Sequence, residues 1–315
     1  MKLYLFTVLL LVLSTQAFTR SIHGKKHNSK HCLNKGYTNK GIKDAGDGLY
    51  TISLGEIKMT VDAEHGAKIL SFKYGDEEIL NQGDAPNSFG STFWTSPQKE
   101  WNWPPVEEYD TKPFAAKIDG DKLLMDGQTS KFGYSIHKEF TADKKSKSIE
   151  IKYSILNESD EERMVAPWEI SRVPNDGMIF FESDAVEAAN NMTALPFEFK
   201  YGGAWYIMDE AEEFRKINSD GKGWLAYLNS KGLLFVKKFQ DLKASEPAPA
   251  EAEIQVYANM GKTFIEVEEQ GAYVSVKPGE SVSWTARWYL TRTETKAIPS
   301  RSLFKKAKNI AKKLA

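Results

Sequence analysis

Apolar and polar residues alternate along most of the chain after Gly48, in short runs separated by Gly, Asp and Asn. A period of two is the pattern of half-buried β-strands, and frequent turn residues are typical of antiparallel meanders. The pattern therefore predicts an all-β sandwich or barrel rather than a parallel α/β sheet. The runs that predict strands are 49–54, 57–61, 68–74, 117–126, 134–141, 148–157, 163–173, 178–182, 224–229, 233–239, 252–257, 264–268 and 282–288.

Residues 264–268 set two carboxylates on one side of a strand. Glu266 and Glu268 share a face because residues two apart in a strand point the same way, and Ile265 and Val267 then face the core. Paired carboxylates on a polar face are suited to the wall of an active site. A solvated acidic face is the alternative interpretation.

The N-terminus has the pattern of an export signal in residues 1–17. Lys2 precedes an apolar run from Leu3 to Leu13, and small residues end the segment at Ala17. The run is too short to span a bilayer, so we expect cleavage after Ala17 and a secreted or periplasmic protein without a transmembrane segment.

Residues 18–47 lack apolar periodicity and predict a flexible basic leader. His23, His27 and His31 stand at helical spacing beside Cys32, the sole cysteine, which excludes an internal disulfide. A metal site would need this segment to be helical, and Gly24 and the missing apolar face argue against a helix. We therefore expect no metal.

The composition of the chain limits the classes of molecule that it is expected to bind. The chain of 315 residues has a net charge of −1, and it shows no nucleic-acid motif, so we expect no nucleic-acid partner. Eight tryptophans are a high count, and planar rings can hold the apolar face of a sugar. Trp94, Trp101 and Trp103 fall in a Pro-rich segment between predicted strands, where they either form a binding platform or close one end of the sandwich.

The C-terminal segment, residues 296–315, predicts a basic amphipathic helix after the β domain at 48–295. Ser300 or Ser302 supplies a start signal. The apolar stripe of this helix either packs onto the sandwich or contacts an anionic surface, and we favour the sandwich.

Several segments resemble the galactose-mutarotase-like β-supersandwich over residues 48–292. The segments that carry the resemblance are Gly66–Phe72, Phe132–Phe140, Ile149–Asp160, Val267–Gln270 and Lys277–Glu280. Gly90–Gln98, Trp103–Pro105 and Pro167–Val173 resemble a secreted branch of that superfamily, a domain of unknown function. The resemblance implies an antiparallel supersandwich fold, a sugar ligand and no cofactor.

Aldose mutarotases open the sugar ring with a Glu base and a His acid, and the resemblance places Glu268 at the base. The strand that should carry the acid reads Pro167–Trp168–Glu169, without the His. Glu169 could substitute as an acid if burial beside Trp168 kept it protonated. A regular strand turns Arg172 to the opposite face, but a bulge would let Glu169 and Arg172 form a structural ion pair instead. His137 is a further candidate acid, on a strand that also reads as a solvated face.

Lys237 lies in a run where one of two consecutive lysines must face inward, and we assign the inward position to Lys237. Three functions follow from the sequence. The first is a sugar-binding protein that kept the groove and lost the acid, with Trp94, Trp101, Trp103, Trp168, Arg172, Lys237 and Glu266 as ligand contacts. The second is an epimerase-type enzyme using Glu268 and Glu169, and the third is a non-catalytic interaction module.

Overall fold

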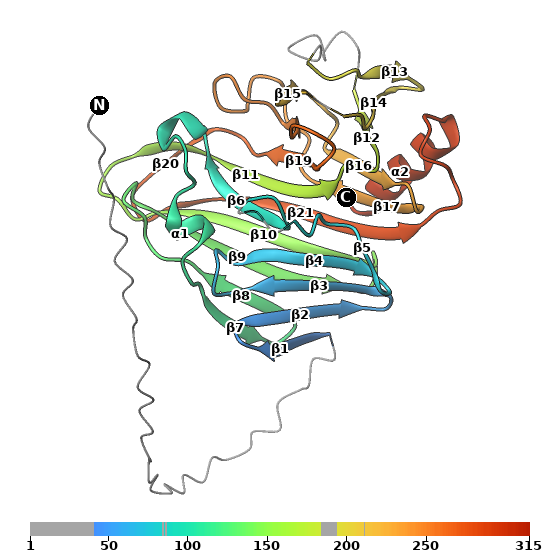
Figure 1. The fold of residues 1–315 in the computed structure, drawn as a ribbon. Helices are drawn as coiled ribbons and strands as arrows, with labels where there is room; N and C mark the ends of the chain where they lie inside the picture. The colour runs from blue at the N-terminus through green and yellow to red at the C-terminus, as the bar shows by residue number, and fades with distance from the viewer. Residues whose placement is uncertain (1–40, 84, 86, 184–193, 211) are drawn as a thin grey trace, which may run out of the picture. The chain divides into compact units, whose positions relative to one another are not determined.

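The computed structural model of the protein describes residues 41–83, 85, 87–183, 194–210 and 212–315. The strands pair antiparallel throughout in two sheets, as the alternating pattern predicts. Figure 1 shows β1 to β4 side by side in one layer. The first sheet runs in the order β1 (Ile42–Gly46), β2 (Leu49–Leu54), β3 (Ile57–Asp62), β4 (Lys68–Tyr74), β6 (Ser91–Ser96), β11 (Arg163–Pro174), β19 (Phe264–Gln270), β18 (Ile254–Ala258) and β15 (Arg215–Ser219), with β5 (Glu77–Glu78) beside β4 and β20 (Val274–Val276) beside β11.

The second sheet packs against the inner face of the first. Its order is β13 (Glu198–Lys200), β14 (Gly203–Ile207), β12 (Gly177–Glu182), β16 (Trp224–Asn229), β17 (Leu233–Lys238), β21 (Ser281–Arg292), β10 (Ser148–Asn157), β9 (Tyr134–Asp143), β8 (Lys122–Asp126) and β7 (Ala115–Asp119). Two short helical turns, Gln98–Glu100 and α1 (Glu107–Asp110), follow β6.

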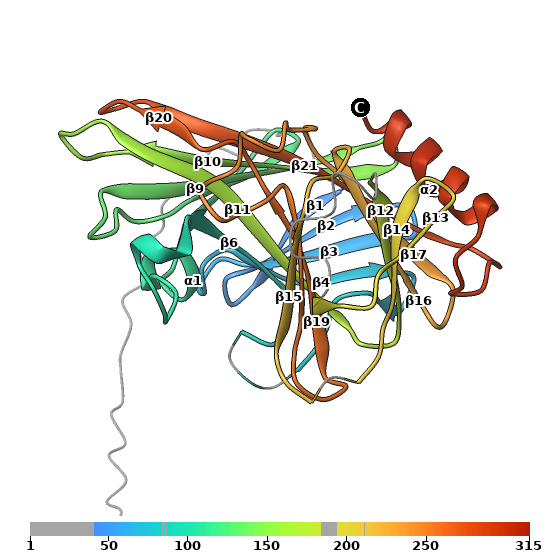
Figure 2. The ribbon, with the colours of Figure 1, turned by 90° about the horizontal axis from the view of Figure 1, so that it is seen from above.

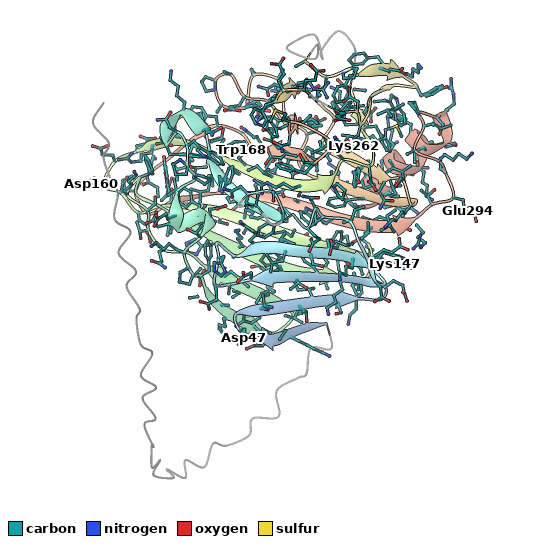
Figure 3. All side chains as sticks on the ribbon, viewed as in Figure 1. Asp47, Lys147, Asp160, Trp168, Lys262 and Glu294 are labelled. Carbon is teal, nitrogen blue, oxygen red and sulfur yellow. The ribbon has the colours of Figure 1, made fainter. Side chains whose placement is uncertain are left out.

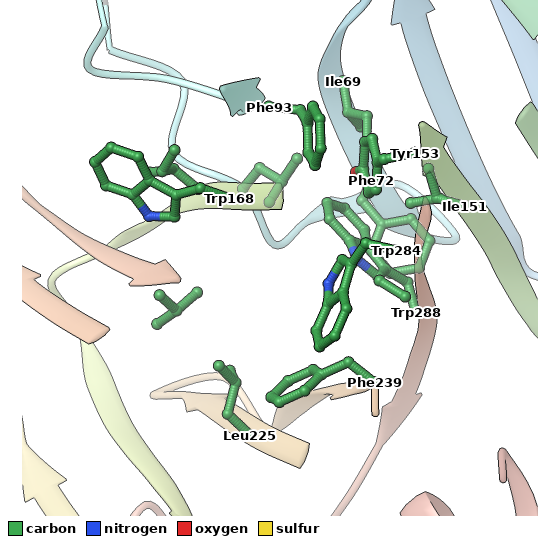
Figure 4. Close-up of a cluster of buried hydrophobic side chains, with 14 of the residues drawn as sticks. Ile69, Phe72, Phe93, Ile151, Tyr153, Trp168, Leu225, Phe239, Trp284 and Trp288 are labelled. Atoms are coloured by element: carbon green, nitrogen blue, oxygen red, sulfur yellow. The ribbon is translucent and has the colours of Figure 1, made fainter. Parts of the chain in front are cut away.

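The main core lies between the two sheets, where alternate residues of facing strands meet. Phe93 of β6 stacks on Tyr153 of β10 with ring centroids 4.3 Å apart, which joins the sheets directly. Trp288 of β21 meets the ring of Phe72 of β4 edge-on at 5.4 Å. Figure 4 shows these side chains gathered between the layers. The sandwich architecture therefore rests on aromatic contacts across the sheets.

The C-terminal helix α2 (Arg301–Lys313) covers the outer face of the second sheet (Figure 2). Ser300 begins it by accepting a hydrogen bond from the backbone N–H of Leu303. Leu303 and Phe304 are buried in a second apolar cluster with Trp205 and Trp224. The helix thus packs on the sandwich, the arrangement favoured above. No helix within the described residues is long and apolar enough to cross a membrane.

One domain boundary and one strand assignment differ from the sequence-based prediction. Strand β1 begins at Ile42, so the folded domain starts before residue 48 and includes the end of the expected leader. Trp94 lies in strand β6, not in a loop. Every residue of β6 is buried, and a strand buried on both faces has no alternation to detect. Residues 1–17, the histidines at 23, 27 and 31, and Cys32 lie outside the described residues.

Candidate functional site

Strands β11 and β19 are adjacent in the first sheet and place a carboxylate beside an indole on its outer face. Ile170 lies opposite Glu268, and Trp168 lies opposite Gln270, so their side chains point to the same side. The indole N–H of Trp168 donates to Glu268 Oε2 at 2.7 Å. Glu266 shares this face, as the strand period predicts, while Ile265 and Val267 are in the core.

Glu268 is fully buried, and its two oxygens differ in their surroundings. Oε2 also accepts from Lys216 Nζ at 3.0 Å. Oε1 has no hydrogen-bond partner in the part of the chain that the structure describes. An acceptor that is buried without a donor carries a free-energy cost, and such groups in folded proteins are uncommon. Glu268 Oε1 is therefore an acceptor whose donor would have to come from a water or a ligand.

Four indoles lie in mutual contact, and one of them, Trp168, contacts Glu268. Trp168 and Trp94 are opposite each other on β11 and β6, with ring centroids 5.6 Å apart, and Trp168 is labelled in Figure 3. Trp101 lies 5.6 Å from Trp94 and Trp103 lies 6.3 Å from it. Asn102 between them adopts φ of 58°, a left-handed conformation that Asn tolerates better than most residues. We call Trp94, Trp101, Trp103 and Trp168 the indole cluster.

The members of the indole cluster differ in exposure. Trp103 is 61% exposed, whereas Trp101 is buried and donates its indole N–H to the carbonyl of Thr95 at 2.9 Å. The interpretation as core packing is therefore confirmed for Trp101, and the binding platform stays a prediction for Trp103. Trp101 packs as core, and Trp103 offers a ring to solvent.

Arg172 and Glu266 form an ion pair on the same face, with Nε and Oε1 2.9 Å apart. Arg172 also donates to Thr92 Oγ1 at 3.3 Å, and its guanidinium lies 5.7 Å from the Trp94 ring. Burial raises the pKa of Glu266, and the positive charge of Arg172 opposes that rise. Arg172 thus orders the edge of the site and balances the charge of Glu266.

Two contributors to this face, Lys216 and Asp110, are missing from the sequence-based site. Lys216 comes from β15, a short strand whose sequence has no clear alternation. Asp110 of α1 accepts from Trp94 Nε1 at 3.1 Å and lies 3.9 Å from Lys68 Nζ. A polar residue after a Pro-rich segment is the sole signal for Asp110, and it does not indicate a partner.

Glu169 and Lys237 lie on the opposite side of the sheet from Glu268. Glu169 faces Glu269 and points between the sheets, where Lys237 of β17 contacts both carboxylates. Lys237 Nζ lies 2.5 Å from Glu269 Oε2 and 3.2 Å from Ser171 Oγ. Lys237 therefore faces inward, as expected, but it contributes to the core rather than to a ligand groove.

The expected pairing of Glu268 as base with Glu169 as acid is therefore wrong. Glu169 lies opposite Glu269 on the inner face, where it is fully buried against Lys237, whereas Glu268 faces outward. The alternative ion pair with Arg172 is wrong for the same reason, since Arg172 lies on the Glu268 face. His137, the other candidate acid, lies on β9 of the second sheet and bonds Asp126 Oδ1 at 2.7 Å. None of these residues supplies an acid beside Glu268.

Tyr257 lies directly opposite Glu266 and shares this face. The pKa of Tyr257, on β18, is raised to about 12 by burial, with further contributions from Glu266 and Glu268.

Within the described ranges, no group of three or more His, Cys, Asp or Glu side chains is placed to hold a metal ion.

Solved structures of other proteins match the fold of this chain. A galactose mutarotase-like protein from Lactobacillus casei matches with a TM-score of 0.54 and 12% identity, over 78% of this chain and 100% of that chain. The chain has the galactose mutarotase-like fold. A galactose mutarotase related enzyme from Lactobacillus acidophilus gives a TM-score of 0.54 at 11% identity, over 80% of this chain and 100% of its own.

A protein of Escherichia coli K12, whose name assigns it provisionally to the aldose 1-epimerases, also shares the mutarotase-like fold. It matches with a TM-score of 0.54 and 13% identity, over 80% of this chain and 100% of that chain. No protein-family model and no curated protein sequence matches the chain. At these identities the likeness concerns the fold, and the chemistry must be argued from the residues of this site.

Proposed function

We propose that the outer face of β6, β11 and β19 binds a carbohydrate. The observation that carries the proposal is Glu268, a buried carboxylate whose Oε1 has no donor among the described residues and whose Oε2 is held by an indole N–H. Sugars present hydroxyl donors beside apolar C–H faces, and carboxylates with aromatic rings match both properties. The mutarotase-like fold of the solved structures supports the same class of ligand.

The indole cluster supplies the apolar part of the proposed site. Trp103 is exposed and lies beside the buried Trp94, so its ring can stack on a sugar without unfolding the core. The hydrogen bond that Trp168 makes with Glu268 sets the position of the carboxylate relative to these rings. A rigid acceptor beside a rigid platform lowers the entropy lost on binding.

Isomerisation at the anomeric carbon is a second proposed function, and Glu268 Oε1 favours it. A carboxylate oxygen that has no protein donor can accept the proton of an anomeric hydroxyl, which is the step of a general base. Ring opening also requires an acid at the ring oxygen. Because Glu169 faces the core, an acid for this step would have to be a different residue, and binding without catalysis stays the first proposal.

The export pattern of residues 1–17 supports a further proposal, that the protein meets its sugar in the periplasm or outside the cell. Peptide sequencing of the N-terminus after expression in a bacterium tests this proposal. A mature chain that begins at Phe18 is the expected result, and a chain that retains Met1 contradicts it.

A glycan array with residues 18–315 tests carbohydrate binding, followed by isothermal titration calorimetry on the sugars that it selects. We expect at least one sugar to bind the native chain and to lose affinity in Glu268→Gln. NMR exchange spectroscopy between α and β anomers of the same sugar tests catalysis. Binding without faster anomer exchange supports a binding protein that lacks catalysis. If both Glu268→Gln and Trp103→Ala bind the sugar as tightly as the native chain, the proposed site is wrong.

A further inference from the structure

The ammonium of Lys216 occupies a position that a bound cation would take. Its Nζ lies 3.0 Å from Glu268 Oε2 and 4.9 Å from the centre of the Trp168 ring. A carboxylate and an indole face together attract an ammonium through charge and through the ring quadrupole. The position between the Glu268 carboxylate and the Trp168 ring thus suits an ammonium, and Lys216 of the chain itself occupies it.

Lys216 is also placed so that it can leave. Strand β15 ends the order of the first sheet and pairs with β18 alone, and the Lys216 side chain is 34% exposed. Glu268, by contrast, is fully buried. A long lysine side chain can carry its ammonium into solvent while its alkyl stem stays packed, provided that another cation takes its place beside Glu268. Rotation of Lys216 into solvent would vacate the position beside Glu268 Oε2 and leave the inner strands unchanged.

Glu268 and the residue opposite it on β18 both carry an acceptor that still needs a donor. Gln255 lies directly opposite Glu268 on β18, and its Nε2 donates to Glu251 Oε2 at 2.8 Å. Because a carboxylate only accepts, this bond fixes which end of the Gln255 amide is the oxygen. Gln255 Oε1 and Glu268 Oε1 are both buried and lack donors within the described residues. A group with several N–H donors and no acceptor, such as an ammonium, matches them.

Charge balance favours the same ligand. Arg172 is already paired with Glu266 at 2.9 Å, so Lys216 is the cation that faces Glu268. A neutral sugar that displaced Lys216 would leave a buried carboxylate without a counter-charge, which is costly. A ligand ammonium would replace the positive charge that is lost when Lys216 moves away from Glu268.

Building on the carbohydrate binding proposed above, we propose that the site takes an amino sugar with an unsubstituted ammonium group. The sugar ammonium replaces Lys216 between Glu268 and the Trp168 ring, and the sugar ring extends toward Trp103. Lys216 is then a competitor built into the chain, because ligand binding must first displace it. Its removal should strengthen the binding of amino sugars.

Calorimetry at pH 6, where a sugar amine is charged, tests the proposal with glucosamine and galactosamine, their N-acetyl forms and the parent hexoses. We expect the amino sugars to bind the native protein about tenfold more tightly than the N-acetyl forms and hexoses, the scale of a charge-assisted hydrogen bond. Lys216→Met should raise the affinity for the amino sugars a further ~3–10-fold. Lys216→Gln repeats the measurement in a polar variant, and circular dichroism verifies that each variant is folded.

Lys122→Met is the matched control, because Lys122 also pairs with a glutamate, Glu139, but on the second sheet. It should leave every affinity unchanged. Hexoses that bind as tightly as amino sugars, with no gain in the Lys216 variants, overturn the ammonium proposal and leave carbohydrate binding standing. If no sugar binds the native protein or either Lys216 variant, both proposals fail. A preference for amino sugars that survives Glu268→Gln also overturns the role of Glu268.

Discussion

Trp168 and Glu169 are consecutive residues of β11 whose side chains face opposite sides of the sheet. The indole of Trp168 donates to Glu268 on the outer face, and the carboxylate of Glu169 contacts Lys237 in the core. Strand β19 repeats the arrangement, since Glu268 faces outward and Glu269 faces Lys237. The candidate site and a buried ionic cluster are therefore attached to the same two strands, and variants must be chosen to separate them.

Glu268→Gln tests the outer face. The amide keeps the shape of the carboxylate but removes its charge, so we expect sugar affinity to fall about 10–100-fold, the scale of a hydrogen bond to a charged group. The melting temperature should change little, because Lys216 is partly exposed and can move into solvent. Calorimetry and thermal circular dichroism measure both quantities. A large loss of stability with unchanged affinity would identify Glu268 as a structural carboxylate.

Trp103→Ala and Trp101→Ala should have different effects because the two rings differ in exposure. Trp103 is 61% exposed, so its removal should weaken sugar binding by about 1–3 kcal/mol and leave stability nearly unchanged. Trp101 is buried among other indoles, so its removal should lower the free energy of unfolding by about 3–5 kcal/mol. Urea unfolding and calorimetry separate the cases. Equal loss of stability in both variants would show that neither ring belongs to a platform.

Lys237→Met tests the buried ionic cluster. The substitution leaves Glu169 and Glu269 facing each other without a cation, so the free energy of unfolding should fall by about 3–5 kcal/mol. Urea unfolding measures the loss. Lys238→Met is the matched control, because Lys238 is the next residue of β17 and is only partly buried. A cluster that does not bind the sheets together would give the two variants the same stability.

Glu269 should make stability depend on pH. Burial raises its pKa well above the ordinary value of 4.5, and the neighbouring Glu169 raises it further, against the opposing charge of Lys237. The folded-state pKa therefore exceeds the unfolded one, and the contribution of this group is complete below about pH 4.5 and is lost as pH rises through the folded-state pKa.

Urea unfolding at a series of pH values measures this dependence, and the difference between the native chain and Glu269→Gln isolates the contribution of one group. The native chain should lose more stability than the variant as pH rises from 4.5. Identical pH profiles for the two proteins would contradict a raised pKa at Glu269.

Removal of residues 300–315 should destabilise the sandwich, because it uncovers the apolar cluster that contains Trp205 and Trp224. We expect a lower melting temperature and no change in association with anionic liposomes, measured by co-sedimentation. Leu303→Ala, which deletes one fully buried side chain, should cost about 2–5 kcal/mol without removing any lysine. Normal melting together with lost liposome binding would instead assign the helix to a surface of anionic lipid.

The strand period predicts which residues share a face but not what faces them. Glu266 and Glu268 are two residues apart in β19 and share a face, whereas Arg172 and Glu169 are three apart in β11 and face opposite ways. Both relationships lie within a single strand, so the sequence period predicts them. The partner of Glu169 is Lys237, which lies on the other sheet and reaches it only through sheet packing. Contacts between sheets depend on the stacking of distant segments, and no local pattern encodes them.

Two parts of the candidate site have weak local signals for a physical reason. Strand β6 is buried on both faces, so Trp94 has no polar neighbours in alternation and reads as part of a loop. Strand β15 is short and mixed in composition, so Lys216 has no periodic context. Edge strands of this kind are defined by the sheet that they join.

The indole cluster has a spectroscopic consequence. The chain has eight tryptophans, and four of them, at positions 94, 101, 103 and 168, form the indole cluster that reaches Glu268 through Trp168. The others lie under α2 or between the sheets, away from solvent. Trp103 is the exposed member, so it should dominate the long-wavelength edge of the intrinsic fluorescence. A ligand that covers this ring would shift the emission to the blue, and the protein would thereby report occupancy of its own site without a label.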